Sequence, residues 1–403
     1  MASASTHRPR RRLRLAFLAT EVRKYSHAQH FLDRLTEGYG WEGHHHIPPF
    51  DLAGLYVDQF PDGDLTADRV RRHRLKLFPT VEETLTLGGR SLAVDGVVLI
   101  AEHGLYPRTE KGQTLYPRHD FFQRCVQVFE RSGRSVPVFN DKHLSTDWKE
   151  CVAMVQASKR LGFPFLAGSS LPVTWRIPDL EIPLHTPLSE SVCVCYGGLD
   201  SYDIHGLETA QCMSERRAGG ESGVRSVQAV RGPKVWEIAA ARPDTPRLLL
   251  AALARSFTFK TREAFPFSPI DLDWLRRQHR NPVAYFFEHN DGFRTTLLLL
   301  NGMLSDFNYA GMVRGTGEIL SCQMYLPMPP ALSTLADFFN PLTHQIEQML
   351  LNNAAPYPVE RTLLCSGMTL AALNSLYQGQ VLLPTPELAV SYSAPPTSHH
   401  WRA

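Results

Sequence analysis

Short apolar runs alternate with helical patterns through the first half of the chain. Apolar runs of strand length lie at residues 13–20, 52–57, 94–101, 136–139 and 164–168. Apolar residues recur at helical spacing in the segments between and around them, at 27–37, 66–73, 81–87, 121–132 and 146–161. Because parallel strands need helical crossovers, this alternation predicts an α/β fold with a Rossmann-like, doubly wound parallel sheet.

The strand at 94–101 leads directly into polar side chains. Its residues 97–101 are all apolar and show no alternation, which is typical of a parallel strand covered on both faces. Ligands of open parallel sheets bind beyond the carboxyl ends of the strands. Glu102 and His103 follow this strand immediately, so we expect them to face a crevice.

Beyond Trp175 the pattern changes. Residues 176–190 are rich in proline and predict a connector. Further strands are predicted at 192–195, 226–231, 294–301 and 303–307, helices at 341–351 and 359–376, and a loop after residue 384. These elements predict a second α/β domain with an open, largely antiparallel sheet. We expect the first domain at 13–175 and the second at 176–385, with the last helices packed back on the first domain.

Charge and cysteine content narrow the class of protein. The 42 basic and 40 acidic residues give a net charge of +2, so no overall field attracts nucleic acid or an anionic membrane. A basic tract at 8–14 precedes an apolar run too short for a membrane span or a signal-peptide core. Seven cysteines, an odd number spread along the chain, indicate free thiols in a reducing compartment. We therefore expect a cytoplasmic protein with a small-molecule partner.

Several motifs, taken in order, resemble the Gfo/Idh/MocA family of oxidoreductases. Residues 55–58 form a strand that ends in an acid, 78–83 match the family's lead into a short helix, and 94–100 match the next strand. Residues 140–143, Asn-Asp-Lys-His, stand where the family has Glu-Lys-Pro, and 196–208 resemble the segment that carries a helical histidine. The resemblance implies a Rossmann domain, a second α/β domain, and oxidation or reduction of a sugar-like polyol with NAD or NADP.

The resemblance also implies roles for individual residues. Lys142 matches the lysine that binds the reacting hydroxyl or carbonyl, and His205 matches the general base, although each also fits a structural role. Asp141, Glu102 and His103 join this catalytic set because they lie at the same predicted strand ends. Candidates for substrate binding are Tyr106, His143, Arg176, Tyr202 and Asp203.

The chain departs from the family in the segment that would hold a dinucleotide. Family members have a glycine-rich turn after the first strand, which lets the backbone approach the pyrophosphate. Residues 19–27 contain no glycine, so the phosphates would depend on Thr20, Arg23 and Ser26. Asp58, at the end of the second strand, resembles the acid that binds a ribose diol, which favours NAD; capping of its own loop is the alternative.

Other interpretations stay open. An insertion at 106–118 is expected to overhang the cleft, as a substrate lid or as a structural loop. A divalent metal would support a lyase or isomerase without a nicotinamide, and its candidate ligands are Glu102, His103, Asp141, His143, His205 and Glu208. A non-catalytic binding protein on the same fold is a third reading. By analogy with the family, an exposed face of the second sheet favours a homodimer or homotetramer.

Overall fold

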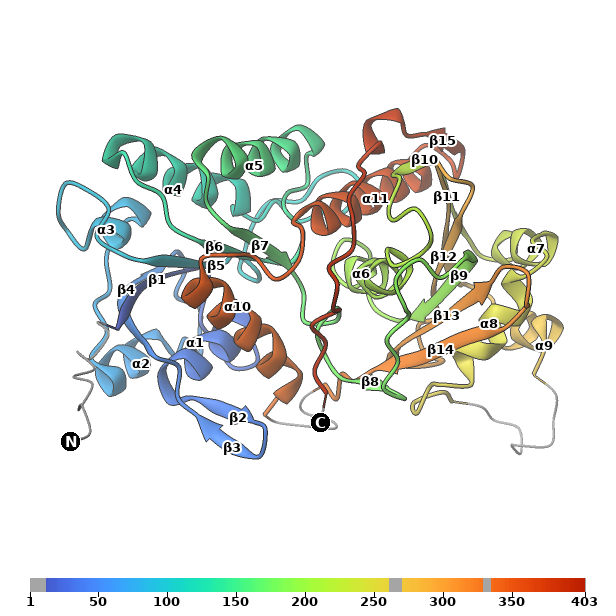
Figure 1. Cartoon of the computed structure of the whole chain (residues 1–403), viewed down its shortest axis with the longest axis horizontal. Helices are drawn as coiled ribbons and strands as arrows, with labels where there is room; N and C mark the ends of the chain where they lie inside the picture. The colour runs from blue at the N-terminus through green and yellow to red at the C-terminus, as the bar shows by residue number, and fades with distance from the viewer. Residues whose placement is uncertain (1–11, 261–269, 329–334, 403) are drawn as a thin grey trace, which may run out of the picture.

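The first half of the chain folds around a five-stranded parallel sheet with strand order β4-β1-β5-β6-β7. The computed structural model describes residues 12–260, 270–328 and 335–402 (Figure 1), so most of the basic tract at 8–14 lies outside the described residues. The strands are β1 (Leu13–Ala19), β4 (Phe50–Val57), β5 (Gly96–Ile100), β6 (Val138–Asp141) and β7 (Phe165–Gly168). The doubly wound parallel sheet predicted from the sequence is confirmed.

Helices cover both faces of this sheet, which explains why its strands are apolar throughout. One face packs against α3 (Val81–Thr86), α4 (Arg118–Ser132) and α5 (Trp148–Leu161). The other face packs against α1 (His27–Glu37), α2 (Thr66–His73) and α10 (Asn340–Asn352), as Figure 1 shows. A Cβ atom at Gly96 would lie 2.2 Å from Leu350 Cδ2, so a larger residue there would require the Leu350 side chain of α10 to shift.

The second half is built on an eight-stranded mixed sheet with strand order β15-β10-β11-β12-β9-β13-β14-β8. Its strands are β8 (Arg176–Ile177), β9 (Leu188–Cys195), β10 (Val224–Arg231), β11 (Val283–His289), β12 (Arg294–Leu299), β13 (Phe307–Val313), β14 (Ile319–Met324) and β15 (Leu382–Pro384). Within this sheet only β12 and β9 pair in parallel among the described residues. The predicted largely antiparallel sheet is confirmed.

Both faces of the mixed sheet are covered, which corrects the expectation of an exposed face. α6 (Asp203–Ser214) and α11 (Glu360–Tyr377) pack on the face that carries Cys193 and Cys195. The face that carries Val192 and Val194 is covered by α7 (Lys234–Ala241), α8 (Thr245–Leu253) and α9 (Leu272–Gln278). The sequence pattern had not revealed these three helices. A homodimer or homotetramer through an open sheet face is therefore not supported.

Some predicted boundaries also differ from the observed ones. The strand predicted at 303–307 is wrong, because residues 301–306 form turns and bends and β13 begins at Phe307. β9 begins at Leu188, inside the predicted connector. A short hairpin of β2 (Tyr39–Trp41) and β3 (His44–His46) was not predicted.

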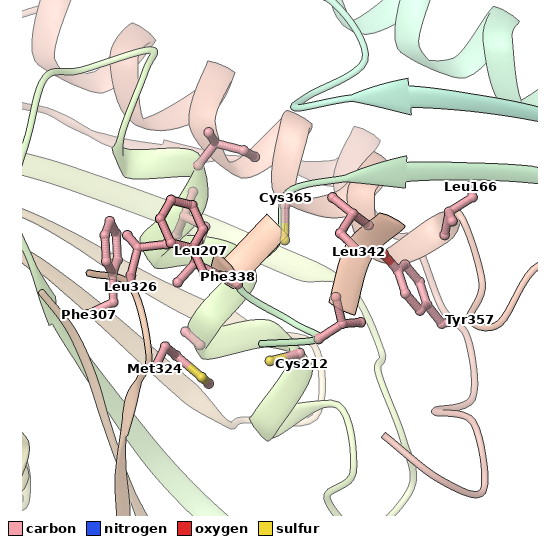
Figure 2. Close-up of a cluster of buried hydrophobic side chains, with 14 of the residues drawn as sticks. Leu166, Leu207, Cys212, Phe307, Met324, Leu326, Phe338, Leu342, Tyr357 and Cys365 are labelled. Atoms are coloured by element: carbon pink, nitrogen blue, oxygen red, sulfur yellow. The ribbon is translucent and has the colours of Figure 1, made fainter. Parts of the chain in front are cut away.

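One hydrophobic core joins the two halves of the chain. Figure 2 shows part of it, in which Leu166 of the parallel sheet, Leu207 of α6 and Cys365 of α11 belong to one cluster. All seven cysteines are buried and unpaired, as expected of core positions. Within the described part of the chain, no helix combines the length and apolar character needed to cross a bilayer. Because the core is continuous, α6 and the parallel sheet hold a fixed relative position.

Candidate functional site

A cavity of about 240 Å³ lies where the carboxyl edge of the parallel sheet meets α6. Its walls come from the turn after β1, the ends of β5 and β6, the start of α6 and the segment before α10. The lining residues are Tyr25, His27, His30, Glu102, His103, Tyr116, Lys142, Ser170, Leu171, Ser201, Tyr202, His205, Leu326, Met328, Phe338 and Phe339. Three stretches, around positions 102, 142 and 205, thus line one hollow.

Lys142 lies at the centre of the polar side of this cavity. It follows β6, and its backbone N–H donates to the Gly168 carbonyl at 3.1 Å. Its Nζ donates to the Ser201 carbonyl at 2.8 Å and to His205 Nε2 at 2.7 Å. Glu102 Oε1 lies 3.7 Å from the same Nζ. The side chains of Lys142, His205 and Glu102 are all buried, so the charges of Lys142 and Glu102 act with little screening.

Arg118 supplies the second positive charge. Its Nη2 donates to Glu102 Oε2 at 2.5 Å. Burial alone raises the pKa of Glu102, but Lys142 and Arg118 outweigh burial and hold the pKa well below its usual value. Glu102 is therefore a carboxylate at neutral pH and offsets part of the buried positive charge. The sequence pattern had not identified Arg118 as a site residue; it is the last residue of the insertion at 106–118 and the first of α4.

Two imidazoles of the cavity are uncharged at neutral pH. Burial, and then the charge of Lys142, hold the pKa of His205 well below its usual value. Burial, and then His27, lower the pKa of His103 to about 3. Since Lys142 donates to Nε2 of His205, the hydrogen-bond network assigns the ring proton to Nδ1. Among the described residues, neither His205 Nδ1 nor His103 Nε2 has a hydrogen-bond partner, although both rings line the cavity.

His27 is a site residue that sequence analysis missed. It is the first residue of α1, directly after Ser26, whose side chain caps the helix. Its Nδ1 lies 2.7 Å from Oδ2 of Asp141, and Asp141 is 1% exposed. The signal that could have revealed His27 is its position, because a side chain that starts α1 lies at the same sheet edge as the ends of β5 and β6.

The remaining wall is apolar. It is formed by Leu326, Met328, Phe338 and Phe339. The Phe339 ring lies 4.9 Å from the His30 ring in a stacked arrangement. The cavity therefore combines a few polar groups on one side with a flat apolar surface on the other, an arrangement typical of small-molecule sites.

Three residues of the lining have left-handed backbone conformations. The φ angles are 67° at Tyr25, 73° at His103 and 68° at Lys142. Such conformations cost about 1–3 kcal/mol each at non-glycine residues, and they cluster at functional sites. The backbone therefore supports the same location as the side chains do.

Of the five predicted substrate-binding residues only Tyr202 lines the cavity. Tyr106 donates to Asp58 instead, and the other three are buried in structural contacts. Arg176 is fully buried elsewhere, and its guanidinium donates to the carbonyls of Leu180 and Pro172, each four residues away along the chain. Asp203 accepts a hydrogen bond from the Tyr285 hydroxyl at 2.9 Å. His143 lies beneath the site, with Nε2 3.2 Å from Arg118 Nη1. These three side chains are committed to structural contacts because each is buried in protein.

The predicted metal constellation does not assemble. Glu208 does not line the cavity, and its carboxylate accepts from the Ser169 N–H at 2.8 Å. Within residues 12–260, 270–328 and 335–402, no group of three or more histidine, cysteine, aspartate or glutamate side chains is arranged to hold a metal ion. Two other candidate ligands, Glu102 and His205, accept hydrogen bonds from Arg118 and Lys142 instead.

The insertion at 106–118 bridges the two halves of the molecule. Its Gln113 side chain and the Thr114 N–H both donate to Asp200, and Tyr116 lines the cavity. Burial, and then the charge of Asp203, raise the pKa of Asp200 to about 6. The insertion thus overhangs the cleft, held in place by a carboxyl group that titrates near neutral pH.

We expect Asp200→Asn to stabilise the protein more at pH 7.5 than at pH 4. Between the ordinary aspartate pKa of about 3.9 and the folded value, the folded protein binds more protons than the unfolded chain, so its stability falls as pH rises. Asparagine cannot ionise and so removes this loss of stability, which is worth up to about 3 kcal/mol for a carboxyl group whose pKa is about 6 in place of about 3.9. Urea unfolding measures the difference in the free energy of unfolding between the variant and the wild type at each pH. An equal difference at pH 4 and pH 7.5 would contradict the raised pKa of Asp200.

The parallel sheet followed by a largely antiparallel sheet matches the fold of solved oxidoreductase structures, and this is the fold that the resemblance to the Gfo/Idh/MocA family predicted. No protein-family model and no curated protein sequence matches the chain. Among solved structures, myo-inositol dehydrogenase from Lactobacillus casei, in complex with NAD(H) and myo-inositol, is 10% identical, with a TM-score of 0.56 over 96% of this chain and 100% of that one. Scyllo-inositol dehydrogenase from the same organism is 11% identical, with a TM-score of 0.54 over 93% and 98%. GenD2 from gentamicin A biosynthesis, in complex with NAD, is 11% identical, with a TM-score of 0.56 over 93% and 96%.

The turn after β1 does not fit the pyrophosphate that this fold implies. Thr20 Oγ1 donates to the Glu102 carbonyl at 2.8 Å, and Ser26 Oγ accepts from the Arg23 N–H at 3.1 Å. Arg23 Nε lies 2.5 Å from Oε1 of the buried Glu21. The three predicted phosphate-binding residues are therefore committed to local contacts, and the Glu21 carboxylate would repel a phosphate.

The end of β4 does not fit a ribose. The Tyr106 and Tyr56 hydroxyls donate to the two oxygens of Asp58, at 2.6 and 2.7 Å. The Gln59 amide exchanges two hydrogen bonds with the backbone of Leu105, at 2.8 and 3.1 Å. Tyr106 of the insertion and Tyr56 of β4 therefore donate to both of the carboxylate oxygens that a ribose diol would use. The cavity of about 240 Å³ is also smaller than the about 300 Å³ at which pockets for drug-sized ligands begin, a size that suits a single small molecule.

Proposed function

We propose that this chain is an enzyme that acts on a small polyhydroxylated, sugar-like molecule through acid/base chemistry at Lys142 and His205. The solved structures with this fold include dehydrogenases of two inositols, so cyclic polyols and their ketones are the first substrates to test. An oxidoreductase is the activity that the fold favours. No step is assigned to NAD or NADP, because the residues at the turn and at β4 do not fit them.

The observation that carries the proposal is the buried contact between Lys142 Nζ and His205 Nε2 at 2.7 Å, beside the Glu102 carboxylate. An ammonium donor, a neutral imidazole and a carboxylate within one small cavity provide the groups for proton transfer to and from oxygen. Burial strengthens each of these interactions because it excludes water.

The geometry indicates a separate role for each of the residues Lys142, His205 and Glu102. Lys142 donates to the oxygen of a bound hydroxyl or carbonyl group, which stabilises negative charge on that oxygen. His205 takes up the hydroxyl proton through Lys142: the ammonium passes a proton to His205 Nε2 as it takes one from the substrate hydroxyl, and the relay reverses when the proton is returned. Glu102 is a positioning residue, because it contacts Lys142 and Arg118 and holds the ammonium in place.

Binding of myo-inositol and scyllo-inositol tests the substrate class. We expect at least one of them to raise the thermal unfolding temperature of the wild-type chain. A ligand at 100 times its Kd adds about 2.7 kcal/mol of stability. Lys142→Met should abolish this effect, whereas Lys149→Met, at an exposed position of α5, should preserve it. Failure of both polyols to bind, or equal binding by the Lys142 variant, would contradict the proposal.

A further inference from the structure

We propose that the reaction is a proton transfer that needs no dinucleotide, with His27 and Asp141 as a second acid/base group in the cavity of Lys142 and His205. This inference rests on the proposed function for its substrate class. It goes further by replacing the nicotinamide that the fold implies with a pair of side chains of this chain.

The position of His27 carries the first part of the argument. In a dinucleotide-binding fold, the turn after the first strand and the start of the next helix hold the pyrophosphate. Here that place holds a histidine whose ring faces the cavity, 5.4 Å from the His103 ring and 5.1 Å from the Phe339 ring. The imidazole therefore takes up space where a phosphate would lie.

The contact with Asp141 carries the second part. A buried carboxylate that accepts from Nδ1–H fixes the tautomer of the ring and leaves Nε2 as a proton acceptor, as in the Asp–His pairs of hydrolases. Asp141 Oδ2 lies 2.7 Å from His27 Nδ1. Its Oδ1 is buried and, within the described residues, has no hydrogen-bond partner. A buried carboxylate that is satisfied on one oxygen only is costly, which points to a role beyond stability.

The third part of the argument concerns the end of β4, where the ribose of a dinucleotide would bind Asp58. Tyr106 on Asp58, and Leu105 on Gln59, join the insertion to the end of β4. The other end of the insertion is bound to Asp200 of the second half. Opening a groove for a dinucleotide would break contacts on both sides of the cavity. The small closed cavity needs no such change to hold a single sugar-like ring.

The chemistry balances without an external oxidant. One imidazole removes the proton from the carbon next to the carbonyl of a hydroxy-ketone, and the electrons of that C–H bond form a C=C bond. The carbonyl oxygen becomes an enolate oxygen, which Lys142 stabilises by hydrogen bonding. The second acid/base group returns a proton to carbon, and the carbonyl re-forms. Substrate and product are isomers, so no hydride is transferred.

Deuterium exchange tests this inference. The purified full chain, free of added nucleotide, is incubated with 2-keto-myo-inositol in D2O, and loss of the proton signals next to the carbonyl is followed by NMR. We expect exchange above the uncatalysed rate, and a reduction of about 100-fold or more in His27→Ala and in Asp141→Asn, the size of effect typical of a lost acid/base group. His44→Ala, at an exposed position of β3, should exchange like the wild type. Circular dichroism establishes that each variant is folded.

Titration with NADH separates this inference from the proposed function. We expect no energy transfer from tryptophan to NADH up to about 1 mM, the upper end of ordinary KM values. Saturable NADH binding, or NADH formation from NAD and myo-inositol, would overturn the inference and leave the proposed substrate class standing. Absence of exchange in the wild type, or unchanged exchange in both His27→Ala and Asp141→Asn, would overturn it as well. Failure of every inositol to bind would instead remove the proposed function.

Discussion

Lys142→Met should reduce the catalysed exchange of 2-keto-myo-inositol by a factor of about 100 to 10,000. The ammonium is the donor closest to His205, and it stabilises negative charge on the substrate oxygen, a contribution typically of this size for a lost positioned proton donor. Methionine keeps much of the length of the side chain and removes only its charge and its donors. The measurement is the initial rate of exchange by NMR at saturating substrate.

The same variant has a second readout that does not depend on turnover. The charge of Lys142 lowers the pKa of His205, so its removal should raise that pKa toward the ordinary histidine value, although burial still opposes protonation. The chemical shift of the His205 ring protons against pH reports the change. Lys149→Met is the matched control, because Lys149 is exposed on α5. An unchanged exchange rate together with an unchanged His205 pKa would show that Lys142 is only structural.

Arg361→Met should lower the free energy of unfolding by about 3–5 kcal/mol, the usual cost of removing one partner of a buried ion pair. Arg361 on α11 binds Glu215, just after α6, through Nε at 2.9 Å and Nη2 at 2.5 Å, and both side chains are 1% exposed. The substitution leaves the Glu215 charge in the interior with only the Tyr392 hydroxyl as a side-chain donor. Urea unfolding measures the loss.

Two controls define the cause of that loss. The double variant Arg361→Met, Glu215→Gln should recover part of the stability, because it removes the stranded charge. Arg225→Met breaks the exposed pair with Glu288 and should cost at most about 1 kcal/mol. If the double variant is as unstable as the single one, lost packing of the guanidinium on the Tyr357 ring would be the cause, and the charge argument would be wrong.

The sequence predicted most of the first domain because each parallel strand is covered on both faces and is therefore apolar throughout. The helices α7, α8 and α9 were missed for a related reason. They lie along the chain between β10 and β11 of a largely antiparallel sheet, where no regular alternation of strand and helix predicts them. The role of their apolar residues, such as Trp236 and Leu248, is seen only in the structure, where these side chains pack on one face of the sheet.

The candidate site was predicted in part. Glu102 and Lys142 follow buried strands, so their position at the carboxyl edge is a local property of the sequence. His205 came from the family resemblance, since nothing within α6 distinguishes its histidine from a core residue. Arg118 and His27 could not be inferred, because their importance depends on contacts with Glu102 and Asp141, which lie far along the chain.

The sequence by itself determined the alternation of elements and the absence of glycine after β1, because both are properties of adjacent residues. Only the tertiary structure decided what fills the place of the missing glycine turn. That place holds His27 against Asp141, and the insertion closes over Asp58, because these contacts join segments more than 40 residues apart. Side chains from distant segments meet through the packing of the two sheets around one core, and no local pattern records which of them will share a cavity.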